Sequence, residues 1–65
     1  MSYIFKDGQL YYQGTGLYPP PDSYVYYSNI KQWFVRGTRV YLRPVKRKHV
    51  PKELLMLCLL LGVPT

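Results

Sequence analysis

A chain of 65 residues is long enough for one domain, so we expect residues 1–65 to form a single small domain. So short a chain buries only about 60% of the surface that it exposes when unfolded, and its core alone gives marginal stability. The single cysteine, Cys58, and the single histidine, His49, exclude an intrachain disulfide and a zinc site built from several such ligands. Oligomerisation or partner binding is therefore the expected source of further stability.

Positive charge is concentrated in the second half of the chain. Residues 1–30 carry one base and two acids, for a net charge of −1, whereas residues 31–65 carry eight bases and one acid, for a net charge of +7. A basic segment of this kind is typical of proteins that bind a polyanion such as nucleic acid. A solvated surface that keeps a small apolar protein in solution has the same composition, so charge alone leaves both interpretations open.

Two features bear on the compartment. A lone thiol suits a reducing environment, and the N-terminal residues lack the long apolar segment of a signal peptide. The apolar run from Leu54 to Leu61 would cover only about 12 Å as a helix, and a bilayer needs roughly twenty residues. The sequence therefore predicts a cytoplasmic protein without membrane association.

The first predicted element is a β-hairpin over residues 3–12. Its two strands flank Asp7-Gly8, a pair that tolerates the positive φ angles of a type I′ turn. A two-residue loop fixes the register, and alternation then places four apolar and aromatic residues on one face. These residues are Tyr3, Phe5, Leu10 and Tyr12.

Residues 14–22 contain three consecutive prolines, which exclude a helix interior or a central strand. We expect a loop there, with a stiff polyproline-type section. The next segment, Ser23 to Tyr27, is rich in aromatic residues and predicts a strand. Ser28-Asn29 is expected to form a turn or a helix cap.

Residues 29–43 allow two structures. In the first, Gln32–Val35 pairs with Thr38–Leu42 around a turn at Arg36-Gly37. In the second, a short helix occupies residues 29–36 and ends at the glycine. We favour the hairpin, because β-branched and aromatic residues dominate and because the second strand alternates between polar and apolar side chains.

The stretch Ile30-Lys31-Gln32-Trp33-Phe34-Val35-Arg36 resembles the recognition-helix region of small phage excisionases. The similarity covers these seven residues, and the rest of the chain lacks the leading helix that such winged domains need. No residue is therefore assigned a role from this resemblance.

The C-terminal segment predicts a helix from Pro51 to about Leu61. Proline suits the first helical position, Gly62 suits a left-handed C-terminal residue, and Pro64 prevents continuation. Before the helix, Pro44 is expected to close the second hairpin, and a basic connector follows it. The predicted fold class is α+β, with a small antiparallel sheet of two hairpins packed by one C-terminal α-helix.

The predicted second hairpin offers a candidate nucleic-acid surface. Its pairing would place Trp33, Val35, Val40 and Leu42 toward the core, and Phe34, Arg39, Tyr41 and Arg43 on an exposed face. Arginine forks bind phosphates and base edges, and aromatic rings stack on unpaired bases. A solvated face of stacked arginines and tyrosines is the alternative. The predicted nucleic-acid-binding residues are Arg36, Arg39, Tyr41, Arg43, Lys46, Arg47 and Lys48.

The predicted helix is apolar on every side. An ordinary surface helix has an apolar stripe and a polar remainder. One stripe is expected to cover the sheet, namely Leu54, Leu57, Cys58 and Leu61. The outer stripe is expected to form a homodimer or partner interface, and its residues are Leu55, Met56, Leu59 and Leu60.

Catalysis has little support in the sequence. The three acidic residues have no spacing that suggests acid–base chemistry. Cys58 lies inside the apolar helix, where burial would raise its pKa and make the thiol inert. We therefore expect no enzyme activity, no metal and no cofactor.

The predicted function is nucleic-acid binding by a small basic regulatory protein that dimerises through its last helix. The alternative is an inhibitor or adaptor of the kind that phages and plasmids encode. Such a protein would bind an acidic host protein through its exposed tyrosines and the outer helix face. A structural subunit of a larger assembly, built on the same helix face, is the third hypothesis.

Overall fold

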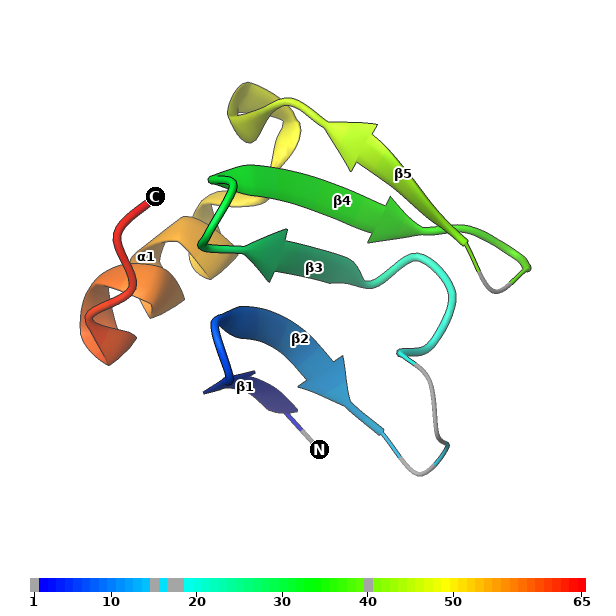
Figure 1. The fold of residues 1–65 in the computed structure, drawn as a ribbon, viewed down its shortest axis with the longest axis horizontal. Helices are drawn as coiled ribbons and strands as arrows, with labels where there is room; N and C mark the ends of the chain where they lie inside the picture. The colour runs from blue at the N-terminus through cyan, green and yellow to red at the C-terminus, as the bar shows by residue number, and fades with distance from the viewer. Residues whose placement is uncertain (1, 15, 17–18, 40) are drawn as a thin grey trace.

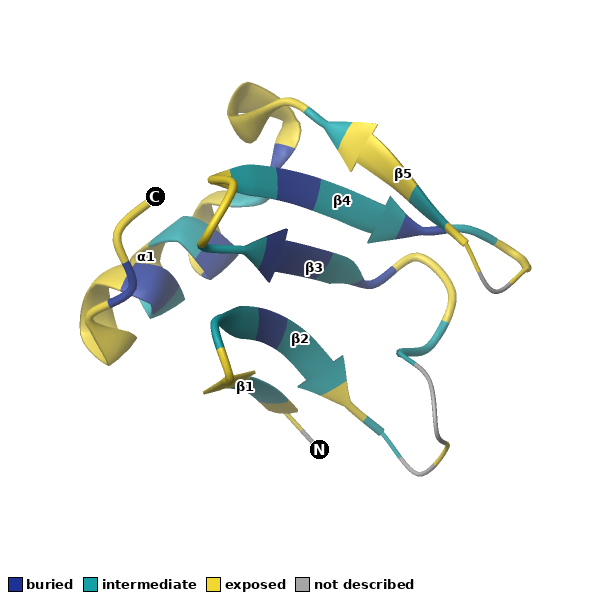
Figure 2. Cartoon of the chain, in the orientation of Figure 1, coloured by how far each residue is buried: buried dark blue, intermediate teal, exposed yellow. Residues whose placement is uncertain are grey.

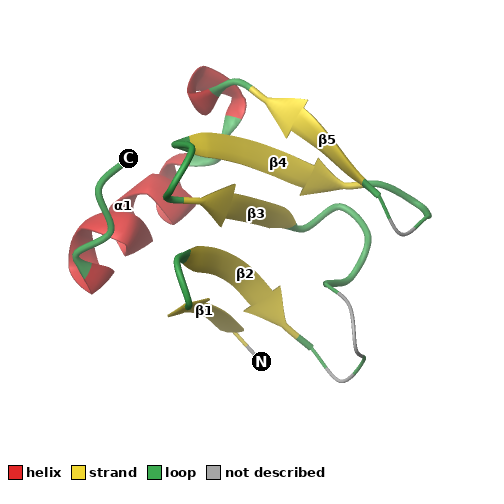
Figure 3. Cartoon of the chain, in the orientation of Figure 1, coloured by secondary structure: helices red, strands yellow, loops and turns green. Residues whose placement is uncertain are grey.

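The computed structural model describes residues 2–14, 16, 19–39 and 41–65. The strands in these ranges form one antiparallel sheet in which each strand pairs with the next along the chain (Figure 1). They are β1 (Ser2–Lys6), β2 (Gln9–Gln13), β3 (Tyr24–Tyr27), β4 (Gln32–Arg36) and β5 (Leu42–Val45). A 3-10 helix, η1 (Arg47–His49), and a helix, α1 (Lys52–Leu61), follow β5. The α+β class is confirmed, with α1 against one face of the sheet (Figure 3).

The first hairpin has the predicted turn and register. Asp7 and Gly8 have φ angles of 53° and 79°, as a type I′ turn requires. Phe5 pairs with Leu10, so the predicted apolar face is correct. The Ser28 hydroxyl donates a hydrogen bond of 2.9 Å to the Gly8 carbonyl, which ties this turn to the turn between β3 and β4.

The predicted loop over residues 14–22 includes Thr15, Leu17 and Tyr18, which lie outside the described residues. Its described end leads into β3 through a turn, where the Ser23 hydroxyl donates to the Pro20 carbonyl at 2.7 Å. The predicted strand after the loop is present as β3, and the predicted turn after it covers residues 28–31.

Residues 32–36 form β4, so the strand alternative is correct and the helix alternative for residues 29–36 is wrong. The excisionase-like stretch is accordingly a turn and a strand. The predicted pairing of this strand is also wrong, because β4 meets β5 across the loop 37–41 and not across a two-residue turn. Trp33 pairs with Val45, and Arg36 pairs with Leu42.

This register differs from the predicted one by an odd number of residues, which moves side chains to the opposite face. Arg43, which pairs with Val35, shares the face of Trp33, and Leu42 lies on the other face. The loop itself is closed by Tyr41, whose ring packs so tightly over Gly37 that a Cβ there would lie 2.9 Å from the ring. Val40, predicted as a core residue, lies outside the described residues.

Pro44 was predicted to close a strand. In the structure it lies inside β5, opposite Phe34. Since β5 is the last strand in the sheet order, its outer side has no partner strand among the described residues. An edge position tolerates proline because the missing N–H faces solvent there.

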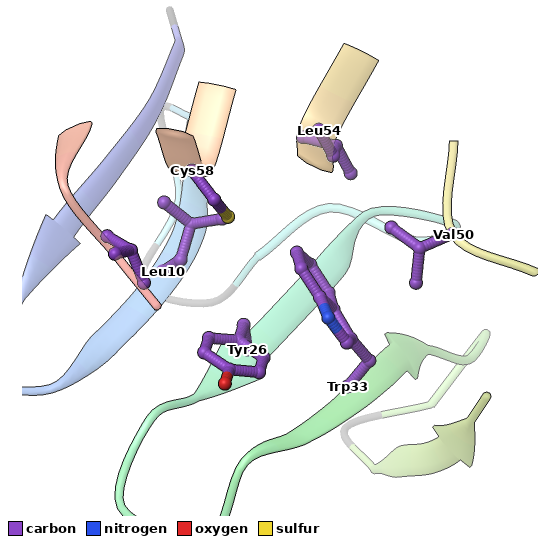
Figure 4. Packing of buried hydrophobic residues seen from close by; sticks show 7 residues of the cluster. Leu10, Tyr26, Trp33, Val50, Leu54 and Cys58 are labelled. Atoms are coloured by element: carbon purple, nitrogen blue, oxygen red, sulfur yellow. The ribbon is translucent and has the colours of Figure 1, made fainter. Parts of the chain in front are cut away.

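The core lies between the sheet and α1 (Figure 4). Leu10, Tyr26 and Trp33 point from three neighbouring strands toward Leu54 and Cys58 of the helix. The ring centroids of Tyr26 and Trp33 are 4.8 Å apart. This face of the sheet therefore supplies large, closely packed aromatic rings, and the helix supplies small and branched apolar side chains.

The C-terminal limit of α1 agrees with the prediction, whereas the helix begins one residue later than predicted, at Lys52, with Pro51 as the N-cap. The end of the helix is folded back onto the core. Gly62 has a φ angle of 76°, which a glycine adopts without steric cost. The N–H of Val63 donates to the Cys58 carbonyl at 2.8 Å, and Val63 is buried. The Tyr26 hydroxyl donates to the carbonyl of Pro64 at 2.9 Å, so a central strand holds the chain end.

Candidate nucleic-acid interface

Five exposed bases lie along one edge of the sheet, on the loop 37–41, β5 and the segment of η1. We call this surface the basic edge, and its residues are Arg39, Arg43, Lys46, Arg47 and Lys48. Exposed residues cover much of β5 and all of η1 (Figure 2). No acidic residue occurs between positions 37 and 52, so the positive charge is not neutralised within the segment.

The basic edge also has a structural use that needs no ligand. An open edge strand is a template for pairing with another chain, and proteins prevent this with charged side chains and proline. Arg43 and Pro44 in the middle of β5 provide both devices. The charge pattern by itself is thus consistent with edge protection and with polyanion binding.

Two predicted members of the site lie elsewhere. Arg36 is 8% exposed and shares with Phe34 the sheet face opposite α1, which we call the open face. Tyr41 packs against Gly37 beside the same face. The predicted alternation of Arg39, Tyr41 and Arg43 on one surface is wrong, because Arg39 and Tyr41 lie before β5 and belong to no strand.

The open face carries a groove of about 560 Å³, which the sequence analysis missed. Its aromatic walls are Tyr11, Tyr27 and Tyr41, and we call it the open-face groove. Val25, which lies between Tyr11 and Phe34 in the register, is 2% exposed and forms the floor. The adjacent pairs Tyr11-Tyr12 and Tyr26-Tyr27 were the available signal, since each pair must place one ring on the open face.

Arg36 is the buried polar group of this groove. Its Nη1 donates to the Gly37 carbonyl at 2.6 Å, whereas its buried Nε has no hydrogen-bond partner among the described residues. An unpaired buried donor costs about 1–3 kcal/mol, so such groups call for an explanation. Lys6 and Asp7 line the other end of the groove, about 13 Å from Arg36 in the direction of the strands. Their charges are opposite and offset each other. The unbalanced positive charge therefore lies at Arg36.

The outer face of α1 is apolar and largely exposed. Met56, Leu59 and Leu60 are 63%, 79% and 83% exposed. Two residues differ from the predicted stripes, because Leu55 is half-buried against the core and Leu61 is exposed. The reversal at Gly62 explains the second difference, since it brings Val63 into the core in place of the last helical leucine. The interface role of the outer face stays a prediction.

Burial shifts the pKa values of three groups on the helix side of the sheet. Burial raises the pKa of the Cys58 thiol, in agreement with the expected inert cysteine. Burial also raises the pKa values of Tyr3 and Tyr26. Within the described part of the chain, no three residues of His, Cys, Asp or Glu are grouped so that they could hold a metal ion. No helix in the described part of the chain is long and apolar enough to cross a membrane.

Comparison with protein-family models, with curated proteins and with solved structures gave no match. The function is accordingly argued from the charge, exposure and geometry of this chain alone.

Proposed function

We propose that the protein is a small basic binding protein, not an enzyme, and that it holds nucleic acid against the basic edge. The observation that carries the proposal is the position of five exposed bases on one acid-free edge of the sheet. Clustered basic charge on one element is the electrostatic signature of a polyanion partner. The role of such a protein would be regulatory, and its single buried thiol suits a reducing compartment such as the cytoplasm.

The mechanism is charge neutralisation with release of counterions. Each phosphate that a lysine or arginine neutralises on a duplex lowers the slope of log K against log salt by about 0.9. Contacts of this kind fix the position of the nucleic acid and carry little sequence information. The basic edge therefore supports salt-dependent binding of DNA or RNA, with specificity left to other parts of the molecule.

A second candidate function is supported by the exposed face of α1. Met56, Leu59 and Leu60 form an apolar surface on a small chain, and such surfaces are typical of interfaces. An inhibitor or adaptor would place this face on a host protein, with the basic edge against acidic residues of that protein. A homodimer would cover the same face and would add stability to a marginal core.

The deciding experiment measures binding of labelled single- and double-stranded oligonucleotides across a salt series. The Arg39→Ala/Arg43→Ala variant is compared with Lys31→Gln/Lys52→Gln, which has the same net charge but is altered at two exposed lysines outside the basic edge, in the turn after β3 and at the start of α1. We expect the first variant to bind more weakly and to lose up to about 1.8 from the duplex salt slope, since it lacks two phosphate contacts. The second variant should retain most of the affinity.

Two results would overturn the proposal. The first is the absence of binding to any oligonucleotide at low salt, which would favour the protein-binding function. The second is an equal loss of affinity in both variants, because net charge would then matter and the basic edge would not. Circular dichroism of each variant checks that the sheet is intact.

A further inference from the structure

The open-face groove brings three tyrosine rings together with one buried guanidinium. The row formed by Tyr11, Val25 and Phe34 crosses the middle of the sheet. Arg36 lies two residues beyond Phe34, or about 7 Å along the strand, on the same face. The groove volume of about 560 Å³ falls within the range of roughly 300–1,000 Å³ that is usual for small-ligand pockets.

The Arg36 guanidinium is buried and lacks a hydrogen-bond acceptor for one of its N–H groups. It is 8% exposed, and arginine buried to this degree is normally paired. Its one hydrogen bond goes to the Gly37 carbonyl, and within the described residues no acceptor meets its Nε. The one carboxylate that lines the groove, Asp7, belongs to the distant end beside Lys6. A phosphate would supply the missing acceptor when the guanidinium turns toward the groove, since guanidinium and phosphate form charge-assisted pairs.

The tyrosines determine what should accompany that phosphate. Tyr41 is 49% exposed and stands beside the Arg36 end of the groove, and Tyr11 is half-buried on the neighbouring row. Exposed rings of this kind on a sheet stack against unpaired bases without strong sequence preference. A base and its own phosphate are close enough for one nucleotide to reach both groups.

We propose that the open-face groove binds one unpaired nucleotide, with its phosphate on the Arg36 guanidinium and its base against Tyr11 and Tyr41. This rests on the proposed nucleic-acid function and specifies the form of the ligand, because a base inside a duplex is not free to enter. The basic edge then holds the sugar-phosphate chain, and the groove selects single strands. The same unit also occurs as a free nucleoside monophosphate, so both sources are tested.

The test uses the full chain, with Arg36→Met and Tyr41→Leu as groove variants and Tyr41→Phe as the matched control. Fluorescence anisotropy measures binding to a labelled single strand and to the duplex of the same sequence. Amide chemical shifts are followed during titration with adenosine monophosphate. Tyr41→Phe keeps the ring that packs over Gly37 and Tyr41→Leu does not, so comparison of the two, with circular dichroism of each, keeps the test valid if Arg36→Met fails to fold.

We expect the groove variants to lose about tenfold or more in single-strand affinity, as is usual when one base loses its stacking partner. Tyr41→Phe should remain within about twofold, because it keeps the ring. Duplex affinity should fall much less than single-strand affinity in the groove variants, because a base inside a duplex does not enter the groove and only the charge of Arg36 acts on the duplex. Adenosine monophosphate should shift the amides of Tyr11 and Arg36 in the wild-type protein.

The remaining outcomes separate the two proposals. If single-strand affinity is unchanged in the groove variants while Arg39→Ala/Arg43→Ala still weakens binding, the groove proposal is overturned and the basic edge is supported. If neither oligonucleotide binds but the monophosphate shifts the Tyr11 and Arg36 amides, the groove is a free-nucleotide site and the proposed function is overturned. If no nucleotide in any form binds, both proposals are overturned.

Discussion

The two faces of the sheet are built from alternate residues of the same strands, yet they have different partners. On the helix side, Leu10, Tyr26 and Trp33 pack against α1 and are at most 2% exposed. On the open side, Tyr11 and Phe34 are half-buried and have no helix above them among the described residues. Apolar side chains on the first face stabilise the fold, whereas those on the second form a groove with a buried charge. Substitutions at neighbouring positions can therefore separate stability from binding.

The largest difference between the faces in the loss of stability on substitution is expected at the adjacent residues Trp33 and Phe34. Trp33→Ala should lower the free energy of unfolding by about 3–5 kcal/mol, because it removes the ring that joins β4 to the helix. A chain of 65 residues has roughly 3–10 kcal/mol in total, so this variant should lose a large fraction of its stability. Phe34→Ala should cost about half as much, because its ring is only half-buried. Urea unfolding monitored by circular dichroism measures both, and equal losses would contradict the division into two faces.

A smaller change in the free energy of unfolding, with the opposite sign, is expected for substitution of Arg36. Arg36→Met removes a buried donor that lacks a partner, at the loss of one hydrogen bond to Gly37. The first change stabilises by about 1–3 kcal/mol and the second costs about 0.5–1.5 kcal/mol, so stability should be equal to wild type or about 1 kcal/mol higher. Arg43→Met is the same substitution at an exposed position and should stay within about 0.5 kcal/mol. A loss of more than about 1 kcal/mol in Arg36→Met would indicate that the guanidinium is a structural group, and not one that awaits a ligand.

The elements also differ in how well they could be predicted from the sequence. The first hairpin was predicted correctly because Asp7-Gly8 determines the turn, and the turn determines the register. The pairing of β5 was not predicted correctly, because the loop before β5 is closed by the Tyr41 ring over Gly37. No local propensity encodes this contact. The odd shift in register then moved Arg43 and Leu42 to unexpected faces.

The candidate site was predictable to a similar degree. The exposed bases of the basic edge were found from the sequence, because a run of charged residues is solvated in almost any fold. The buried position of Arg36 could not be found, since the residues that line the groove with it, such as Val25 and Tyr41, come from other parts of the chain. The helix stripe was wrong at Leu55 and at Leu61, and the reversal at Gly62, which inserts Val63 into the core, explains the difference at Leu61.

The next prediction compares the adjacent residues Tyr26 and Tyr27, whose rings lie on opposite faces. Tyr26→Phe removes the hydrogen bond to the Pro64 carbonyl and should cost about 0.5–1.5 kcal/mol. The Tyr27 ring packs edge-on against Phe34 at 5.4 Å, and Tyr27→Phe retains that ring contact. Its cost should be below about 0.5 kcal/mol. A cost for Tyr27→Phe equal to that for Tyr26→Phe would show that the open face is as closely packed as the helix side.

The smallest predicted effect is a loss of folding stability that is absent at neutral pH and appears only at alkaline pH. Burial raises the pKa values of Tyr3, Tyr26 and Cys58 on the helix side, so the fold stabilises the neutral form of each group. That contribution is complete below the pKa of the unfolded chain and is lost as the pH rises through the higher pKa of the folded protein. The urea midpoint should therefore be constant between pH 6 and 8 and should fall from about pH 9–10 upward. Tyr26→Phe removes one of the three groups and should make this fall shallower than in the wild-type protein. A midpoint that falls as steeply in Tyr26→Phe as in the wild-type protein would place the alkaline sensitivity outside this group.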